Sequence, residues 1–302
     1  MKINTIHLSD NIRGMKELPG ECIDMTLTSP PYYNQRDYKD DNQLGLEETV
    51  DDYISKLCDV FDEVYRVTKK TGVCWVNIGD TYSKKCLLQI PSKFEIEMVK
   101  RGWNLRNEII WSKPNPQPTS AKDRFWNNHE KLFMFVKNTK GYYFDQPVVP
   151  QKEISIRRFF SQNRAEYRKD NGINDKEGYS ISFERQKQHY EKMVSKSGIE
   201  KDFDYEELLR SGKVPTRPKM TVWEITTKSY KGAHFATYPE ELCLDPILSS
   251  CPEDGVVLDP FMGAGTTAVV AVKNDRNFIG YEINEDYLHL AEQRISETNK
   301  NE

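Results

Sequence analysis

The stretch Val256-Val257-Leu258-Asp259-Pro260-Phe261-Met262-Gly263-Ala264-Gly265-Thr266-Thr267 predicts a strand, a glycine-rich turn and a helix in direct succession. The apolar run ends in a carboxylate, and the glycines allow a ligand to approach the backbone of the turn. No lysine follows them, so the turn does not match a loop that cradles nucleotide phosphates. Asp259 would suit a cationic group better than a phosphate. The stretch therefore predicts a βα unit of an α/β fold, with a ligand site at the end of its strand.

A second apolar run, at 277–282, also ends in a carboxylate, Glu282. An acid at this place suits the diol of a ribose. An acidic, glycine-lined site at the carboxyl ends of parallel strands fits S-adenosylmethionine. For Gly263 and Gly265 alone, a tight turn without a ligand explains the sequence equally well.

A third motif, Thr28-Ser29-Pro30-Pro31-Tyr32, follows the strand-like run at 23–27. Its two prolines exclude a helix, so the chain leaves the strand as a stiff, extended corner. The Ser29 hydroxyl and the Pro30 carbonyl are two acceptors for an NH2 group, and Tyr32 offers a ring that can stack on a heterocycle. Taken alone, the motif is explained as well by a proline turn with a surface tyrosine.

Together, TSPPY at 28–32 and DPFMGAGTT at 259–267 resemble the motifs of DNA methyltransferases that modify amino groups, N4 of cytosine or N6 of adenine. The catalytic motif precedes the cofactor motif, as in the β class of that family, and the resemblance covers roughly 1–145 and 230–295. It implies a Rossmann-like, S-adenosylmethionine-dependent methyltransferase fold, circularly permuted, with a mostly parallel sheet and a helical insertion. The first and last strands are then expected to be neighbours.

The resemblance also implies roles for single residues. Asp10 would accept from the adenine amine of the cofactor, although a simple helix cap explains it equally well. His234 lies in a segment that helps to enclose the methionine end. The expected catalytic residues are Ser29, Pro30, Pro31 and Tyr32. The expected cofactor-binding residues are Asp10, Thr28, Asp259, Pro260, Phe261, Gly263, Gly265, Thr266, Glu282 and His234.

Two further segments, 111–118 and 123–137, resemble family segments around the pocket for the target base. The second contains His129 and Glu130, which could be mistaken for a metal pair. No third ligand is within reach in the sequence, so we expect no metal site. No Pro-Cys motif is present, which disfavours methylation of a ring carbon through a covalent adduct.

The 302 residues are 37% hydrophobic and 30% charged, enough for one large α/β domain with an insertion. No run approaches the 18 apolar residues of a membrane helix, and we expect neither a signal peptide nor a membrane partner. The six cysteines form no CxxC pair, which is typical of reduced thiols in a cytosol.

Charge is uneven along the chain. The net charge is −4, but residues 151–231 hold 18 Lys and Arg against 13 Asp and Glu. A basic middle segment is compatible with nucleic acid binding, and a solvated charged insertion explains it equally well. We therefore expect a catalytic and cofactor-binding domain at 1–145 and 229–302. We expect an inserted target-recognition region at 146–228.

The predicted function is transfer of a methyl group from S-adenosylmethionine to N4 of a flipped cytosine in double-stranded DNA, within a restriction-modification system. Alternatives are an N6-adenine DNA methyltransferase, an RNA or protein-glutamine methyltransferase, and a non-catalytic nucleic-acid-binding module. Expected partners are DNA and a cognate restriction endonuclease. We expect a monomer or homodimer in the prokaryotic cytoplasm, associated with the nucleoid.

Overall fold

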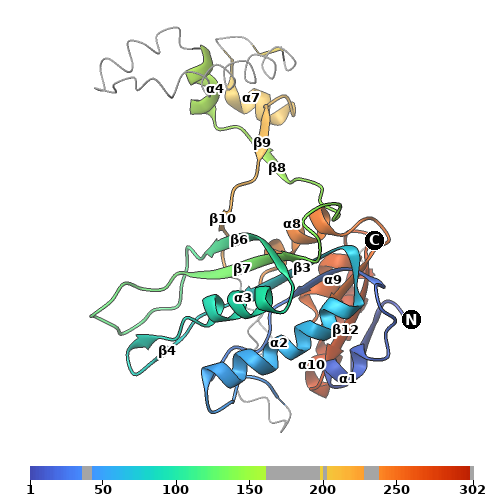
Figure 1. The fold of residues 1–302 in the computed structure, drawn as a ribbon. Helices are drawn as coiled ribbons and strands as arrows, with labels where there is room; N and C mark the ends of the chain where they lie inside the picture. The colour runs from blue at the N-terminus through green and yellow to red at the C-terminus, as the bar shows by residue number, and fades with distance from the viewer. Residues whose placement is uncertain (36–42, 161–197, 200–202, 228–237, 300–302) are drawn as a thin grey trace. The chain divides into compact units, whose positions relative to one another are not determined.

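The computed structural model describes residues 1–35, 43–160, 198–199, 203–227 and 238–299 (Figure 1). In chain order its elements are β1 (Thr5–Leu8), α1 (Asn11–Met15), β2 (Ile23–Thr28), α2 (Val50–Val67), β3 (Thr68–Ile78), β4 (Tyr82–Ser83), β5 (Cys86–Leu87), α3 (Ile90–Lys100), β6 (Asn104–Ser112), β7 (His129–Val136), β8 (Val148–Pro150), α4 (Glu153–Phe160), α7 (Tyr205–Arg210), β9 (Thr216–Pro218), β10 (Val222–Glu224), α8 (Glu240–Ser250), β11 (Val256–Asp259), α9 (Thr266–Val272), β12 (Asn277–Glu282) and α10 (Glu285–Asn299).

The central sheet has the order β1-β12-β11-β2-β3-β7-β6-β10. Five neighbouring strands from β1 to β3 run parallel, and β7 is antiparallel to both of its neighbours, β3 and β6. The final pair, β6 and β10, is parallel again. The predicted α/β fold with a mostly parallel sheet is confirmed.

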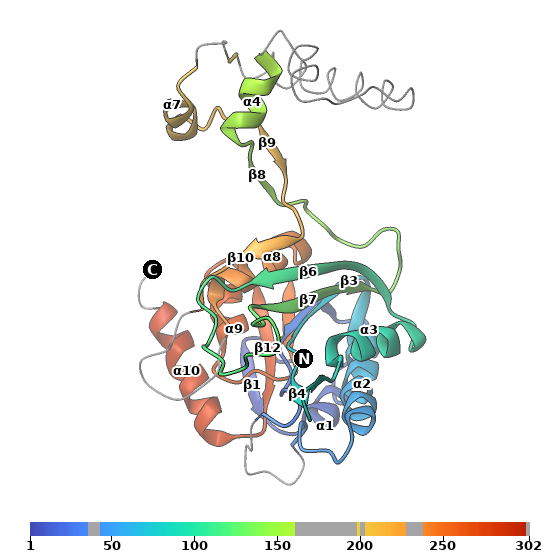
Figure 2. The ribbon, with the colours of Figure 1, turned by 90° about the vertical axis from the view of Figure 1, so that its left-hand side faces the viewer.

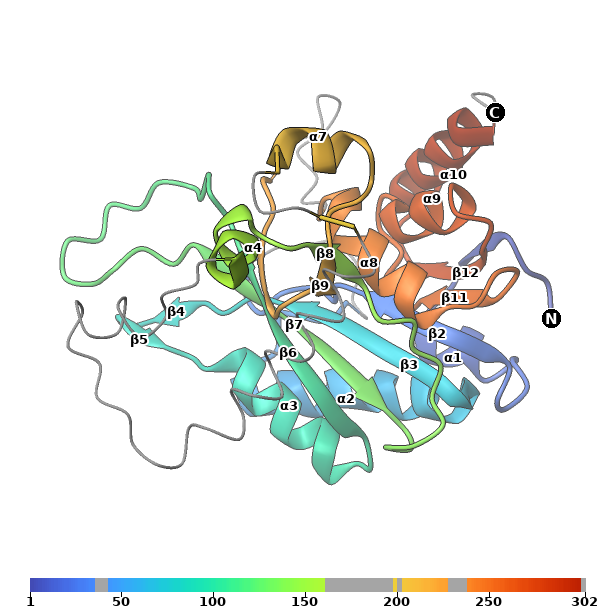
Figure 3. The ribbon, with the colours of Figure 1, turned by 90° about the horizontal axis from the view of Figure 1, so that it is seen from above.

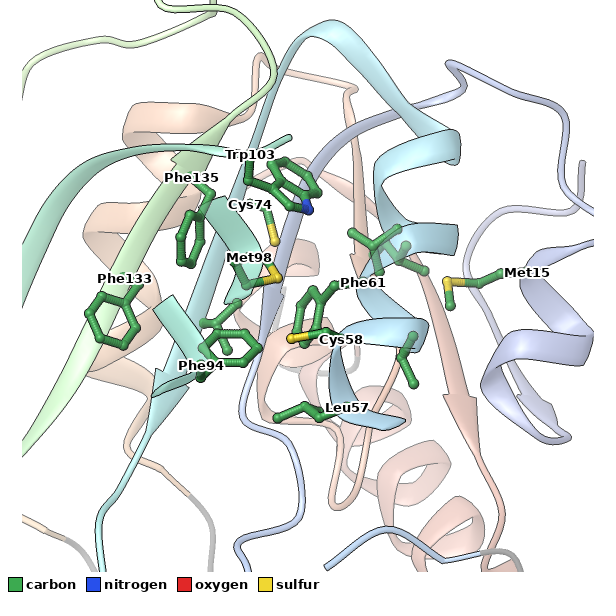
Figure 4. Close-up of a cluster of buried hydrophobic side chains, with 14 of the residues drawn as sticks. Met15, Leu57, Cys58, Phe61, Cys74, Phe94, Met98, Trp103, Phe133 and Phe135 are labelled. Carbon is green, nitrogen blue, oxygen red and sulfur yellow. The ribbon is translucent and has the colours of Figure 1, made fainter. Parts of the chain in front are cut away.

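Helices cover both faces of the sheet, as Figure 2 shows, with α2 and α3 on one side and α9 and α10 on the other. The central strands β2, β3 and β11 are largely buried on both faces, and alternate residues of β3 enter different cores. Cys74 packs with Phe61 and Phe94 beneath α2 and α3, in the cluster drawn in Figure 4. Trp75 packs with Leu242 and Ala268 of α8 and α9. Burial on both faces explains why these strands are continuous apolar runs.

Most predicted elements are present, and two boundaries differ. The cap residues Ser9-Asp10-Asn11 predict a first helix that reaches about Leu18, but α1 ends at Met15. The helical spacing of apolar residues from Val50 predicts a helix that ends at Thr71-Gly72, but α2 ends at Val67 and β3 begins at once. Thr68 is already extended, and it pairs with Ile23 of β2. Pairing in the sheet therefore overrides the helical pattern.

The strands that come first and last along the chain, β1 and β12, are neighbours in the sheet, as the permuted order predicts. Thr5 pairs with Ile279, and Leu8 pairs with Glu282. Beside them, the Phe278 amide donates to Asn4 Oδ1 at 3.0 Å.

The chain divides into two compact units, Met1–Asp145 with Met220–Glu302, and Gln146–Lys219. Strand β10 adds Val222–Glu224 to the sheet, so these residues belong to the first unit and not to the insertion. The second unit has its own small core of Ile156, Ile199, Phe203 and Val214. Across the described ranges, no helix combines the length and apolarity that crossing a membrane requires.

Candidate active site

Strands β11 and β2 are neighbours at the point where the strand order reverses. From β11 the chain crosses through α9 to β12 on one side, and from β2 through α2 to β3 on the other. Ligands of open α/β sheets bind at the carboxyl ends of strands at such a point. Thr28 ends β2 and Asp259 ends β11, and Thr28 Oγ1 donates to Asp259 Oδ1 at 2.5 Å. The two motifs, 231 residues apart, therefore meet directly.

Asp259 is only 1% exposed, and its carboxylate accepts four hydrogen bonds. Oδ1 accepts from Thr28 and from the Phe261 amide at 3.0 Å. Oδ2 accepts from Thr267 at 2.6 Å and from the Tyr238 hydroxyl at 3.3 Å. Burial raises the pKa of Asp259, and the hydrogen bonds act in the opposite direction. A carboxylate has about four acceptor positions, so Asp259 is occupied in joining β2, the turn and α9.

The glycine-rich turn has an open side and a closed side. Gly263 and Gly265 adopt left-handed φ angles of 50° and 76°, which favour glycine. A Cβ at Gly265 would lie 2.8 Å from Ala291 Cβ, because α10 packs against it. At Gly263 a Cβ would meet nothing closer than Phe261 O at 3.9 Å. The backbone is therefore approachable at Gly263 and shielded at Gly265.

Glu282, at the end of β12, supports this turn from the neighbouring strand. Its Oε2 accepts from the Gly263 amide at 2.8 Å, and Oε1 accepts from the amides of Ile283 (3.0 Å) and Asn284 (2.9 Å). Burial raises the pKa of Glu282, and these backbone donors lower it. Three donors leave about one acceptor position on the carboxylate for another partner, such as a hydroxyl group.

The end of β1 completes this side of the site. Asp10 is the N-cap of α1, since its side chain accepts from the Arg13 amide at 2.8 Å. The expected capping role is therefore present, and contact with adenine stays a prediction. The next residue, Asn11, donates from Nδ2 to Pro260 O at 3.1 Å and so connects α1 to the glycine-rich turn.

Two other expected cofactor residues behave differently. The Thr266 hydroxyl accepts from Arg294 of α10 at 3.1 Å, and the same guanidinium donates to Ala264 O at 2.5 Å. Thr266 is 4% exposed, so its side chain serves the contact between α9 and α10. His234 lies outside the described residues.

The corner after β2 is held by the residues around it. The Tyr53 hydroxyl of α2 donates to Pro31 O at 2.8 Å. A Cβ at Gly79 would lie 2.7 Å from Tyr32 Cε2, so the ring rests against the backbone that follows β3. Within the described residues the Pro30 carbonyl accepts no hydrogen bond, and Ser29 is half-buried beside it. Both predicted acceptors therefore lie together at the end of β2.

A polar network lies behind this corner. The Tyr32 hydroxyl donates to Glu130 Oε2 at 2.7 Å, and Asn77 Nδ2 donates to the same oxygen at 2.9 Å. Glu130 Oε1 forms an ion pair with Lys113, both side chains being less than a fifth exposed. Burial and the Glu130 carboxylate raise the pKa of Tyr32 well above its ordinary value, so the hydroxyl keeps its proton.

The network determines the direction of the hydrogen bonds. A carboxylate only accepts, so the Tyr32 proton points toward Glu130. The Tyr32 oxygen then accepts from Asn77 Nδ2 at 2.8 Å and, over a longer 3.4 Å, from Ser29 Oγ. The single hydrogen of Ser29 points to Tyr32, and Asn77 Nδ2 lies 3.5 Å from Oγ as a distant donor. One lone pair of Oγ is therefore left to accept from another amine.

Sequence reasoning did not find this network. The run at 73–78 predicts only a buried strand for Asn77. Lys113 and Glu130 lie in the two segments that resemble family segments around the target base, but neither is assigned a role there, and Glu130 is otherwise considered only as a metal ligand. One usable signal was a polar Asn77 within the otherwise apolar run of β3. Asn77 Oδ1 is also a buried acceptor for which the described part of the chain supplies no donor.

A family model described as DNA methylase, of the N6 and N4 type, matches residues 23–293. The type II methyltransferase M.Cfr9I of Citrobacter freundii is 31% identical, over 96% of this chain and 87% of that protein. The type II methyltransferase M.SmaI of Serratia marcescens is 30% identical, over 96% of this chain and 90% of that protein.

Solved structures show the same fold. The PvuII DNA methyltransferase, described as cytosine-N4-specific, superposes with a TM-score of 0.64 at 17% identity, covering 99% of this chain and 91% of that one. A protein of Thermus thermophilus described as a DNA modification methylase, complexed with S-adenosyl-L-methionine, superposes with a TM-score of 0.59 at 21% identity. The match covers 97% of this chain and 93% of that one.

Proposed function

This chain belongs to the DNA methylase family of the N6 and N4 type, and from that membership we propose that it methylates N4 of cytosine in double-stranded DNA. The methyl donor is S-adenosylmethionine, and the target base is flipped out of the duplex before transfer. The type II names of its relatives favour a modification enzyme of a restriction-modification system, with a cognate endonuclease as partner. Its place would then be the prokaryotic cytoplasm, at the nucleoid.

The observation that carries the proposal is the hydrogen bond between Thr28 and Asp259. Thr28 directly precedes residues 29–32, which we call the acceptor corner, and Asp259 directly precedes the glycine-rich turn. The hydrogen bond therefore brings the start of the acceptor corner against the start of the turn. Methyl transfer between two bound molecules needs the donor and the nucleophile side by side, with reacting atoms about 3–3.5 Å apart. A site with two adjoining halves meets that requirement.

The residues at the ends of β11 and β12 fit S-adenosylmethionine. Glu282 retains an acceptor position for a ribose hydroxyl, and the open side of Gly263 lets a ligand approach the backbone. Asp10, which is exposed at the end of β1, would accept from the adenine amine. The bound cofactor supplies an electrophilic methyl group on a sulfonium, so the protein needs no metal to activate it.

The acceptor corner performs the other task. The lone pair of an exocyclic amine is shared with its ring, which makes the amine a poor nucleophile. Ser29 Oγ and the Pro30 carbonyl would accept the two amine hydrogens and draw the nitrogen toward tetrahedral geometry. Tyr32 would stack on the base. Glu130 supports this polarity because it directs the Ser29 hydrogen away from the amine.

Cytosine is proposed over adenine on two grounds. The acceptor is a neutral serine at position 29, which in the resembling family is typical of N4-cytosine enzymes, whereas aspartate is typical of N6-adenine enzymes. The structural relative from the PvuII system is described as cytosine-N4-specific. The family itself includes both reactions, so adenine N6 is the alternative that the experiment must distinguish.

The second unit, Gln146–Lys219, is proposed as the target-recognition region. Arg157 stands 4.7 Å from the ring centroid of Phe203, pairs with Glu153 at 2.6 Å and is half exposed. Its exposed part would contact a phosphate or a base. The excess of cations over this part of the chain supports the same role.

The decisive experiment incubates the protein with unmethylated bacterial genomic DNA and methyl-labelled S-adenosylmethionine. The DNA is then digested to nucleosides for mass spectrometry. We expect the modified nucleoside to be N4-methyldeoxycytidine. N6-methyladenine would assign the alternative, and label found only in parallel RNA or protein samples would overturn the proposal. Sequencing that detects modified bases maps the site.

A further inference from the structure

An unusually exposed aromatic pair lies in the loop between β6 and β7. The Phe125 side chain is 97% exposed and that of Trp126 is 51% exposed. Single exposed apolar residues are common on protein surfaces, but here two large aromatics are adjacent, and Phe125 is almost completely uncovered. Their exposure indicates a surface that is covered by a partner.

The adjoining β4–β5 hairpin has an unusual turn. Its two turn residues, Lys84 and Lys85, both adopt left-handed φ angles, 48° and 68°. Such a two-residue turn normally uses Asn-Gly or glycines, since a side chain in this conformation costs about 1 kcal/mol or more. The hairpin thus presents two lysines at its tip at the expense of backbone strain, which is typical of functional positions.

Hairpin and loop form one assembly, which we call the aromatic arm: residues 82–87 and 113–128. Arg124 lies 3.8 Å above the Tyr82 ring, and the Tyr82 hydroxyl donates to Asn127 at 3.2 Å. Lys85 pairs with Asp123 at 3.1 Å. Figures 1 and 3 show the hairpin and the loop side by side on one side of the sheet.

The base of the aromatic arm is part of the catalytic corner. The Lys113 amide donates to Asn128 O at 2.6 Å, which closes the loop. The Lys113 side chain pairs with Glu130, the residue that receives the Tyr32 hydroxyl. Any duplex that delivers a base to Ser29 therefore passes beside this loop.

We propose that the aromatic arm binds the DNA duplex at the target base, with Phe125 as a wedge that fills the gap in the base stack while the target is flipped. Lys84, Lys85 and Arg124 contact the phosphates that flank this gap. The inference rests on the proposed function and adds to it a residue that plays no part in methyl transfer itself.

The chemistry of the aromatic arm fits a nucleic acid duplex. Extruding a base costs a few kcal/mol of lost stacking and pairing, and apolar side chains inserted between base steps recover part of this cost. Lysines and arginine around an aromatic supply the phosphate contacts that hold the backbone in register. A protein partner would not require these cations beside the aromatic pair.

The wedge is tested with Phe125→Ala, a change that leaves the core intact because the side chain is exposed. The substrate is a duplex of about 30 base pairs that contains the site mapped above. Two forms are compared: a paired duplex, in which the target base has its partner, and an abasic duplex, in which the nucleotide opposite the target lacks its base. We expect a single-turnover rate about 10-fold below wild type on the paired duplex. On the abasic duplex, where flipping is cheap, the variant should come within about threefold of wild type.

The matched control is Ile96→Ala, which removes another exposed apolar side chain, on α3. It should resemble wild type on both duplexes. A Phe125→Ala rate equal to wild type on the paired duplex, or an equal loss on both duplexes, overturns the wedge. If wild-type protein methylates no DNA, the proposed function fails instead. Failure of the proposed function is thus distinguished from failure of the wedge alone.

The phosphate contacts are tested by affinity. Lys84→Ala/Lys85→Ala should bind the paired duplex more weakly and lower the slope of log affinity against log salt by about 2. Lys16→Ala/Lys70→Ala, which removes two exposed lysines elsewhere, should leave the slope at its wild-type value. Equal slopes for both double variants overturn the assignment.

Cys86 gives a readout that is independent of activity. It is exposed on β5, directly after the two lysines. Duplex DNA should slow its labelling by a maleimide in wild-type protein at least about fivefold, and less in Lys84→Ala/Lys85→Ala. Unchanged labelling in the presence of saturating DNA overturns the proposed surface.

Discussion

The Ser29 hydroxyl can donate or accept, and its role depends on where its own hydrogen points. In this structure the direction is set by Glu130, which accepts the hydrogen bond from the Tyr32 hydroxyl and leaves the Tyr32 oxygen as an acceptor for Ser29. Ser29 can then receive a hydrogen of the target amine. An aspartate at the same position would accept without such support.

Ser29→Ala removes the acceptor and keeps the corner. We expect kcat to fall by at least about 100-fold, comparable with the loss of one preorganised hydrogen bond in other enzymes. Calorimetric affinity for S-adenosylmethionine should change by less than about threefold. Ser296→Ala, on the surface of α10, serves as the control. Turnover unchanged from wild type would remove Ser29 from catalysis.

Glu130→Gln keeps the size of the side chain but adds a donor beside Tyr32 and removes the charge that pairs with Lys113. We expect kcat to fall about 10–100-fold, since a hydrogen bond to a charged group contributes about 1.5–3 kcal/mol. Cofactor affinity should be preserved. Glu108→Gln breaks a comparable ion pair, with Lys131 at 3.1 Å, and is the control. Equal rates for the two variants would contradict the role of Glu130.

The hydrogen-bond network shows what the sequence could not supply. Ser29, Pro30 and Tyr32 could be predicted because their chemistry lies in adjacent residues. Glu130 acts through Tyr32, 98 positions away, and only the antiparallel β7 brings it to this edge of the sheet. Asp259 was predicted to be near the cofactor, yet two of its donors, Thr28 and Tyr238, come from other segments that no local pattern connects to it.

Among the elements, the turn between β11 and α9 depends on its neighbours for its shape. Glu282 holds the Gly263 amide from β12, and α10 closes against Gly265. The cofactor half of the site is therefore positioned by packing between elements as well as by its own glycines.

Glu282→Ala leaves three amides without their acceptor and removes the proposed ribose contact. We expect the affinity for S-adenosylmethionine to fall about 10–100-fold, corresponding to about 1.4–2.7 kcal/mol. Isothermal titration calorimetry measures it directly. Glu285→Ala, an exposed change in the first turn of α10, should bind as wild type does. Wild-type affinity in Glu282→Ala would rule out the predicted role.

Gly265→Ala introduces a Cβ at a φ of 76° and 2.8 Å from Ala291 Cβ. The left-handed backbone alone costs about 1–2 kcal/mol, and the displaced α10 adds to this. We expect the free energy of unfolding to fall by about 2–4 kcal/mol in urea titrations. Gly141→Ala, which also has a positive φ but meets nothing within 4 Å, measures the backbone cost alone. Equal losses in the two variants would contradict the packing argument.

Element boundaries show where periodicity loses to tertiary contacts. The apolar stripe of α2 could be predicted because its buried residues recur at helical spacing. Its end could not, since Thr68 caps the helix with its hydroxyl on Val64 O at 2.6 Å while its backbone already pairs with β2. That pairing partner, Ile23, lies far earlier in the chain.

For the molecule as a whole, the insertion leaves and re-enters the first unit at adjacent points. Strands β8 and β9 are antiparallel, and Val148 pairs with Pro218. The Lys219 amide donates to Pro147 O at 2.9 Å. The two crossing segments are therefore close together, and a short linker can replace everything between them.

A variant that joins Asp145 to Met220 through a short glycine linker tests the division of labour. The first unit keeps both cores of the sheet, so we expect cooperative unfolding within about 5 °C of the wild-type midpoint. Cofactor affinity should be within about threefold of wild type, and methylation of the mapped site should be lost. Retained methylation at that site would contradict the recognition role of residues 146–219, whereas an unfolded product would contradict the independence of the first unit.

The pairing of β1 with β12 has a consequence for biosynthesis. Thr5–Leu8 is synthesised well before its neighbour in the sheet, Ile279–Glu282. At about 5–20 residues per second, the early strand waits on the order of tens of seconds for its partner. Until β1 and β12 have paired, Asn11 is not held in place to donate its hydrogen bond to Pro260 O. A nascent chain therefore cannot assemble the proposed cofactor site until β12 has been translated, so we expect shorter nascent polypeptides to be inactive.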